Sequence, residues 1–336
     1  MDYRRLGDSS LQVSPLCLGT MMFGGRSSPA TAKRIIARAR DAGVNFIDTA
    51  DAYVGGRSEE IVGSAIKAER DHWVLATKFG NRIGDRPNDG GLGRHWMHRA
   101  IEASLRRLRT EVIDVYYLHL EDHDTPLEET VSAMGDLIAA GKVRYFGVSN
   151  FRSWRIAEVV WLCGELGVDP PIVCQPYYNA VNRQPEVEVL PACDHYGLGV
   201  VPYSPLARGV LTGKYQPGRK PPPTSRAGIR DPRMLNSEWR PESLEIAQRI
   251  KAHAEARGST ATSFAVNWLL NNQIVTSVLS GPRTVQQWND YVRALDDDFT
   301  SEDEDLLNSL VATGHPSTPG YNDPNYPIEG RPTWTE

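Results

Sequence analysis

The sequence predicts an α/β protein built as a (β/α)8 TIM barrel. Eight short apolar runs alternate with eight helical patterns, and most runs begin roughly 30 residues after the previous one. The runs are almost entirely apolar, which is typical of parallel strands covered on both faces. A doubly wound Rossmann sheet is the alternative. It is disfavoured because it has six units rather than eight, and because no G-x-G-x-x-G follows the first run.

The repeat unit is a strand followed by a helix. The expected strands begin at Pro15, Val44, Trp73, Val112, Val143, Pro171, Leu198 and Val275. The expected helices cover residues 31–43, 58–69, 95–108, 126–142, 153–167, 185–197, 242–258 and 284–295, with a last one near 301–311. Several should begin at a capping residue and end at glycine, as Thr31 with Gly43 and Ser153 with Gly164 do.

Three segments lie outside this repeat. Residues 1–14 contain a short hairpin that turns at Gly7-Asp8 and is placed to close the bottom of the barrel. Residues 216–240, rich in proline, form a long loop after the seventh strand. Residues 312–336 form a Pro/Gly/Tyr-rich tail without helix or sheet, which either borders the barrel mouth or packs on the barrel wall or a neighbouring subunit. We expect one domain over residues 1–336.

Composition restricts the class of partner. The net charge is −5 and the pI about 5.9, without a long basic run, which argues against nucleic acid and anionic membrane surfaces. A small-molecule partner is therefore expected. The first residues resemble neither a signal peptide nor a membrane span, so we expect a cytoplasmic protein. The four cysteines form no CxxC pair, and we expect buried thiols without a disulfide or zinc.

Polar residues follow the expected strands where barrel enzymes carry their chemistry. Asp48, Lys78 and His119 end strands two, three and four, and Tyr53 lies five residues beyond Asp48. A phenol becomes a better acid beside an ammonium, and a buried ammonium needs a carboxylate partner. The imidazole can polarise a substrate oxygen or pass a proton to Tyr53. The four residues together therefore predict proton transfer to a carbonyl, with no metal required.

These motifs resemble the aldo-keto reductase superfamily. Phe46 begins FIDTADAYVGGRSEEIVG, which is similar to the first signature of that family, and ATKFG, DVYYLHLED, GKVRYFGVSNF, QPYYN, VPYSPLARGVLTGKY and VLSGPRT follow in the same order. The resemblance covers roughly residues 3–310. It implies an oxidoreductase that uses NADPH, or NADH, and reduces an aldehyde or ketone or oxidises the alcohol. The motifs are similar to a bacterial branch acting on sugars, small aldehydes, pyridoxal-like compounds or secondary alcohols.

The resemblance also implies residues for the cofactor. Its nicotinamide ribose would lie near Gly19, Thr20, Met21 and Asp48. Its carboxamide would be held by Ser149, Asn150 and Gln175, with the ring on Tyr203. Its pyrophosphate would run along Ser204, Leu206, Arg208, Lys214 and Arg226. The adenosine end would reach Gly281, Arg283 and Gln287, although Asp290-Tyr291 stands where the family usually has Glu-Asn. Arg283 would meet the 2′-phosphate of NADPH or lie on the surface paired with Asp290.

Other functions compete with this interpretation. His119 and His123 are spaced i, i+4, but this spacing makes a metal site on a helix and His119 ends a strand. Lys78 could form a Schiff base in a barrel aldolase, which leaves Asp48 and Tyr53 unexplained. Potassium-channel β subunits resemble this fold, and the segment PPTSRA is similar to one of their loops. A non-catalytic subunit that senses nicotinamide is therefore the alternative from another class.

Overall fold

The computed structural model describes residues 1–328 and 330. The chain forms two compact units. The first comprises Met1–Tyr177, Val187–Tyr203 and Leu270–Arg293, and the second comprises Tyr178–Glu186, Ser204–Leu269 and the described residues from Ala294 onward. The assignment of one domain stays a prediction. None of the helices described is long and apolar enough to cross a membrane.

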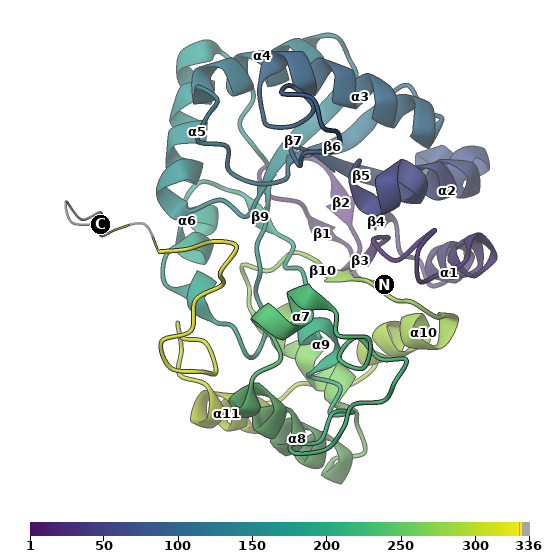
Figure 1. Cartoon of the computed structure of the whole chain (residues 1–336), viewed down its shortest axis with the longest axis vertical. Coiled ribbons are helices and arrows are strands. Elements are labelled where there is room, and N and C mark those ends of the chain that lie inside the picture. The colour runs from purple at the N-terminus through teal and green to yellow at the C-terminus, as the bar shows by residue number, and fades with distance from the viewer. Residues whose placement is uncertain (329, 331–336) are drawn as a thin grey trace. The chain divides into compact units, whose positions relative to one another are not determined.

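One parallel sheet forms the centre of the first unit (Figure 1). Its strands are β3 (Leu16–Gly19), β4 (Phe46–Asp48), β5 (Val74–Phe79), β6 (Ile113–Leu118), β7 (Val143–Ser149), β8 (Val173–Gln175), β9 (Gly199–Val200) and β10 (Val278–Ser280). The order is β10-β3-β4-β5-β6-β7-β8-β9, and every neighbouring pair is parallel. Val200 forms a parallel bridge with Val275, and the Leu279 N–H donates to the Pro202 carbonyl at 3.1 Å. The two ends of the sheet therefore meet as the predicted barrel requires, and the Rossmann alternative is wrong.

Helices follow these strands and cover their outer side (Figure 1). They are α1 (Pro29–Asp41), α2 (Arg57–Ile66), α3 (Arg94–Leu108), α4 (Leu127–Ala139), α5 (Ser153–Leu166), α6 (Val189–His195) and α10 (Val285–Ala294). From α1 to α6, each helix contacts the next. Two short 3-10 helices, Tyr53–Gly56 and Lys67–His72, flank α2. The helices bury one face against the strands, as expected for a parallel sheet without an exposed side.

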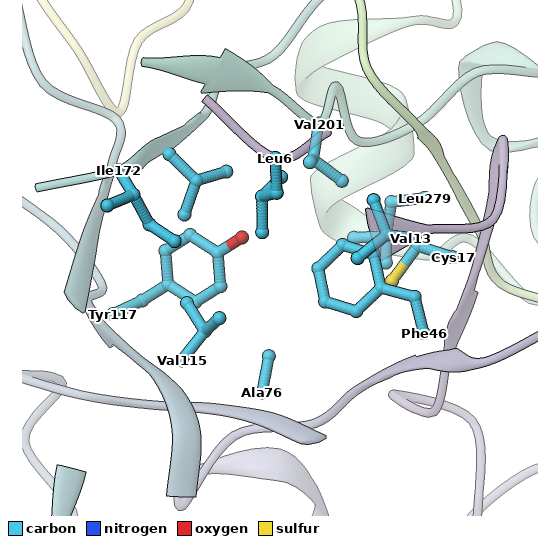
Figure 2. Close-up of a cluster of buried hydrophobic side chains, with 11 residues drawn as sticks. Leu6, Val13, Cys17, Phe46, Ala76, Val115, Tyr117, Ile172, Val201 and Leu279 are labelled. Carbon is cyan, nitrogen blue, oxygen red and sulfur yellow. The ribbon is translucent and has the colours of Figure 1, made fainter. Parts of the chain in front are cut away.

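The predicted N-terminal hairpin is confirmed. β1 (Arg4–Arg5) pairs antiparallel with β2 (Gln12–Val13). Leu6 and Val13 are fully buried in the cluster of Figure 2, among side chains from the barrel strands. Gly7 has a φ of +55°, and a Cβ there would lie 2.1 Å from the Ile172 carbonyl oxygen, so the turn requires glycine.

Most predicted helices are present, with some boundaries displaced. The first begins at Pro29 rather than Thr31, because the Ser28 side chain accepts the Thr31 N–H at 3.2 Å and Ser28 is the N-cap. Helix α5 does not end at Gly164. It continues to Leu166 and ends where Gly167 adopts a left-handed φ of +64°. The sixth pattern is divided into a 3-10 turn, Gln184–Glu186, and the shorter α6.

The second unit contains helices that the sequence analysis missed. Its predicted helices are α8 (Pro241–Ala256) and α11 (Ser301–Leu310), and the helices not predicted are α7 (Pro232–Ser237) and α9 (Ala261–Asn271), most of which belongs to this unit. The unit also contains the 3-10 turns Gln184–Glu186 and Ala207–Gly209. Residues 216–240 are therefore not all loop, since Asp231 caps α7 by accepting the Met234 N–H at 3.0 Å. No helix was expected at α9, because its buried side chains occupy too much of its surface to give a clear apolar stripe.

The tail is held within the second unit by three arginines. Arg183 donates to the Thr313 hydroxyl at 3.2 Å, the Arg240 guanidinium lies 3.7 Å from the Tyr321 ring centre, and Arg233 pairs with Asp323. Apart from a single bridge at Pro316, the described residues 312–328 contain no helix or strand, as expected. A role of this tail beside the substrate stays a prediction, and Trp334 lies outside the described residues.

We predict that Leu6→Ala destabilises the protein by about 2 to 5 kcal/mol, because it leaves a cavity where the hairpin meets the barrel interior. The check is a urea unfolding curve followed by circular dichroism. Leu166→Ala is the control, since Leu166 is 44% exposed and its loss should cost about 0.5 kcal/mol or less. Equal shifts of the two midpoints would show that Leu6 is not part of a tightly packed core.

Candidate active site

The four residues predicted to carry the chemistry lie at the carboxyl ends of neighbouring strands. Asp48 is the last residue of β4, Lys78 lies next to the end of β5, and His119 directly follows β6. Tyr53 begins the 3-10 turn after β4. Because β4, β5 and β6 are adjacent and parallel, their ends meet on one side of the barrel. The structure therefore brings all four together.

A buried ion pair lies at the centre of this group. Lys78 Nζ donates to Asp48 Oδ1, to the Thr49 carbonyl at 2.8 Å and to the Tyr53 hydroxyl at 3.3 Å. The other oxygen of Asp48 accepts from Gln175 Nε2 at 3.1 Å. The Lys78 side chain is 0% exposed and that of Asp48 is 1% exposed. An ammonium has three hydrogens, and here each of them has an acceptor.

In the ion pair of Lys78 and Asp48, each charge stabilises the charged form of the other group. Burial raises the pKa of Asp48 above its ordinary value, and the charge of Lys78 and the hydrogen bonds from Lys78 and Gln175 limit that rise. Desolvation lowers the pKa of Lys78, but the charges of Asp48 and Tyr53 and their hydrogen bonds outweigh it. The pKa of Lys78 therefore lies above its ordinary value, and Lys78 stays an ammonium at neutral pH.

The turn after β4 fixes the position of Tyr53. The Asp51 N–H donates to the carbonyl of Lys78 at 3.1 Å, which ties this loop to β5. Val54 follows Tyr53 with a φ of +52°, an unfavourable conformation for a β-branched residue. Gly56 has a φ of +87° and packs against Arg107, where a Cβ would lie 2.8 Å from Cδ. The turn that positions the Tyr53 phenol therefore contains a strained residue, Val54.

His119 lies beside the ion pair as a neutral imidazole. Its ring centre is 6.0 Å from that of Tyr53, and the two rings are nearly perpendicular, at 78°. Burial, and then the positive charge of Lys78, lower the pKa of His119 to about 3. Its Nδ1 lies 2.8 Å from Asn81 Nδ2, a contact that the sequence analysis did not anticipate. Neutral imidazole can donate one hydrogen bond without bringing a second cation near the ammonium.

The residues expected at the nicotinamide form a hydrogen-bonded set in the first unit. Ser149 Oγ donates to the Gln175 carbonyl at 2.9 Å, and the Tyr203 hydroxyl donates to Asn150 Oδ1 at 2.8 Å. Asn150 has a φ of +59°, and its Nδ2 donates to the His119 carbonyl at 2.9 Å. The Tyr203 ring stacks on Tyr177. Their contact with a cofactor stays a prediction.

The expected ribose residues lie at the end of β3, next to β4. Gly19 pairs with Asp48 in the sheet register, and the hydroxyl and N–H of Thr20 both donate to the Asp48 carbonyl, at 2.9 and 3.0 Å. Met21 is 38% exposed.

The expected adenosine residues lie at the start of α10. The Arg283 N–H donates to Gln287 Oε1 at 2.8 Å, and Asp290 accepts from Gln286 at 2.9 Å. Gly281 is exposed.

The expected pyrophosphate residues all belong to the second unit. Arg208 pairs with Glu238 at 3.1 Å, and Arg226 pairs with Asp231 at 2.9 Å. Lys214 Nζ lies 5.0 Å from the Tyr215 ring centre. The Leu206 carbonyl accepts the Gly209 N–H at 2.7 Å, and that of Ser204 accepts from an asparagine side chain at 3.0 Å. Two of the three cations are thus paired with carboxylates, and contact of the three with an anionic ligand stays a prediction.

A second buried carboxyl behind the site also escaped the sequence analysis. Asp51 is 1% exposed, and among the described residues no other side chain donates to either of its carboxyl oxygens. Burial, and then the charge of Glu59, raise the pKa of Asp51 to about 8, and Arg107 opposes that rise. Glu59 itself accepts from Thr77 Oγ1 and Arg107 Nε, both at 2.6 Å. The motif DTAD places Asp51 three residues after Asp48, but it does not show that the Asp51 carboxyl is buried.

Metal chemistry has no support from the side chains. Within residues 1–328, no group of three or more His, Cys, Asp or Glu side chains is arranged to hold a metal ion. His119 follows a strand, and His123 lies near Glu121 at 3.4 Å. The four cysteines are buried thiols.

Comparison with known proteins assigns the chain to a class and then to a family. The strand ends of this barrel carry a carboxylate, an ammonium and an imidazole beside a phenol, the kinds of group that transfer protons in enzymes. Residues 15–312 match the sequence model of the "Aldo/keto reductase family". The chain therefore belongs to the aldo/keto reductase family, and it is an NAD(P)H-dependent oxidoreductase.

Relatives span nearly the whole chain. A rice protein (Oryza sativa subsp. japonica) named "Probable voltage-gated potassium channel subunit beta" is 36% identical over 330 residues, 96% of this chain and 100% of the relative. An Arabidopsis thaliana protein of the same name is 38% identical, with 88% and 92% covered. "Uncharacterized oxidoreductase YrpG" from Bacillus subtilis (strain 168) is 35% identical, with 95% and 98% covered.

The raised pKa of Asp51 predicts how stability depends on pH. Between the ordinary value of 3.8 and about 8, the native protein holds a proton on Asp51 that the unfolded chain has lost. Stability therefore falls as pH rises through this window, by at most about 1.4 kcal/mol per pH unit. Asp51→Asn removes this loss, so its stability relative to wild type should rise with pH and level off above about pH 8.

Urea unfolding at several pH values between 5 and 9 checks this expectation. Asp71→Asn is the matched control, because it makes the same chemical change at an exposed position. A stability difference between Asp51→Asn and wild type that is independent of pH would contradict a protonated Asp51.

Proposed function

We propose that this protein uses NADPH to reduce an aldehyde or ketone to the alcohol, or catalyses the reverse reaction, with Tyr53 as the general acid or base. One observation carries the proposal: Lys78 Nζ donates to the Tyr53 hydroxyl at 3.3 Å while it is paired with buried Asp48. The phenol oxygen accepts from Lys78, and the phenol hydrogen is the proton that would pass to a substrate oxygen. The ammonium also stabilises the phenolate that remains after proton transfer.

The residues around the site suit a nicotinamide cofactor. Ser149, Asn150 and Gln175 supply hydroxyl and amide groups, which can both donate to and accept from a carboxamide. When bound, the cofactor supplies or accepts the hydride. His119 is neutral and can donate one hydrogen bond to the substrate oxygen, and Tyr53 moves the proton to or from the same oxygen. The alcohol thus gains its proton from Tyr53, which regains one from solvent.

The aldolase alternative fits the site poorly. A Schiff base requires a neutral amine, but the pKa of Lys78 is raised by Asp48 and Tyr53, and its three hydrogens are all engaged. A non-catalytic subunit that senses nicotinamide is kept as the second candidate, because two plant relatives are named as probable potassium channel β subunits. Turnover of a carbonyl panel with NADPH separates the two, because a sensing subunit would bind NADPH and show negligible consumption.

We predict that Tyr53→Phe lowers kcat by a hundredfold or more, on the order expected for loss of a general acid, while NADPH still binds. Lys78→Met should cause similar loss and change the pH profile. The measurements are NADPH oxidation at 340 nm and a fluorescence titration with NADPH. Tyr145→Phe is the control, because the Tyr145 hydroxyl lies near Ser10 and the N-terminal hairpin. Full activity of Tyr53→Phe would exclude this mechanism.

We also expect NADPH to be preferred over NADH, through Arg283. A guanidinium can bind the 2′-phosphate with two charge-assisted hydrogen bonds. Arg283→Ala should therefore lower kcat/KM with NADPH by roughly 10- to 100-fold and change kcat/KM with NADH little. Arg293→Ala, at an exposed position in the last turn of α10, is the control. Equal kcat/KM for the two cofactors, unchanged in Arg283→Ala, would refute this role.

A further inference from the structure

Asn81 reaches the active site because of the turn that follows β5. The strand ends at Phe79, and Gly80 then adopts a φ of +123° that favours glycine. A Cβ on Gly80 would lie 2.9 Å from Leu92 Cδ2, and the Gly80 carbonyl accepts the Gly91 N–H at 2.9 Å. The chain therefore turns sharply two residues after Lys78, and Asn81 lies over the end of the neighbouring strand.

His119 is held at three different atoms. Its N–H donates to the Phe79 carbonyl at 3.0 Å, and its carbonyl accepts from Asn150 Nδ2 at 2.9 Å. These two bonds fix the main chain but leave the ring able to rotate. Asn81 Nδ2 contacts the ring itself, at 2.8 Å from Nδ1.

The chemistry of the two groups decides where the ring hydrogen lies. With Nδ2 of Asn81 facing the ring, the amide donates, because its nitrogen has no lone pair to offer, and Nδ1 is then the acceptor. A neutral imidazole has one ring hydrogen, which must then be on Nε2. The low pKa of His119, caused by burial and by Lys78, agrees with a neutral ring.

We propose that Asn81 is a positioning residue that fixes the ring orientation and tautomer of His119, so that Nε2 is the nitrogen that donates to the substrate oxygen. The identity of that oxygen rests on the proposed function, whereas the tautomer does not. A carboxylate at this position would act in the opposite way. It would accept from Nδ1 and favour the imidazolium, as carboxylates do beside histidine.

The test is Asn81→Asp, which keeps the shape of the side chain and replaces the donor by an acceptor. Asn88→Asp is the matched control, because it adds the same charge to the same loop at an exposed position. The first readout is the 15N NMR spectrum of the full chain with labelled histidine, with His119 assigned by comparison with His119→Asn. Wild type should show a neutral ring with its hydrogen on Nε2. Asn81→Asp should show Nδ1 protonated and His119 titrating well above pH 3, and Asn88→Asp should match wild type.

The second readout is the pH profile of carbonyl reduction. Asn81→Asp should lower kcat at least tenfold near pH 8, where the neutral ring has its hydrogen on Nδ1, and should leave the KM for NADPH unchanged. Activity should return as the pH falls, because the imidazolium has a hydrogen on both nitrogens. Damage to packing alone would not be reversed by acid. Asn88→Asp should retain the wild-type profile.

Two results would overturn the inference: a wild-type ring with its hydrogen on Nδ1, or unchanged His119 signals and pH profile in Asn81→Asp. If no carbonyl is reduced by the wild type, the NMR readout still decides the role of Asn81, so that failure of the proposed function remains distinct. If Asn81→Asp does not fold, Asn81→Leu takes its place. Its His119 nitrogen shifts should then move towards the average of the two tautomers, and unchanged shifts would overturn the inference.

Discussion

The ion pair between Lys78 and Asp48 is the interaction on which the site depends. Removing two charges from water is costly, and their attraction compensates only when the remaining hydrogen-bonding capacity is also satisfied. Here Lys78 has three acceptors, and Gln175 donates to the second oxygen of Asp48. These partners come from β4 and its loop and from β8, so the pair requires the closed barrel. One of the three acceptors is Tyr53, so its phenol belongs to the same hydrogen-bonded group as the ion pair.

The groups around the pair are neutral at ordinary pH, and each is neutral for a different physical reason. His119, whose pKa is about 3, is uncharged because of burial and the nearby ammonium. Asp51, whose pKa is about 8, holds its proton because it is buried near Glu59. Between about pH 3 and about pH 8, neither His119 nor Asp51 places a charge beside the ion pair. An amide, Asn81, is a suitable partner for the imidazole because it forms the hydrogen bond without adding charge.

The barrel and the four strand-end residues could be predicted from the sequence, because apolar runs at regular spacing identify strands and the polar residue after each run identifies the mouth. Element ends were less predictable: Gly164 and Gly167 are both glycines, and only the left-handed turn at Gly167 ends α5. Helix α9 was not predicted, because its apolar residues do not form one clear stripe along the helix. Asn81 and Asp51 were missed because their roles arise from contacts between strands and from burial, which the local pattern does not contain.

The relatives bear names of two kinds, channel subunit and oxidoreductase, although all share much of their sequence with this chain. A fold can serve either role, so the chemistry of the site has to distinguish the two. Binding a nicotinamide needs hydroxyl, amide and cationic groups. It does not need a phenol that accepts a hydrogen bond from a buried ammonium, or an imidazole held neutral beside it. Burying a charge next to a strained turn is costly, and the proton transfer that we propose would explain that cost where binding alone would not.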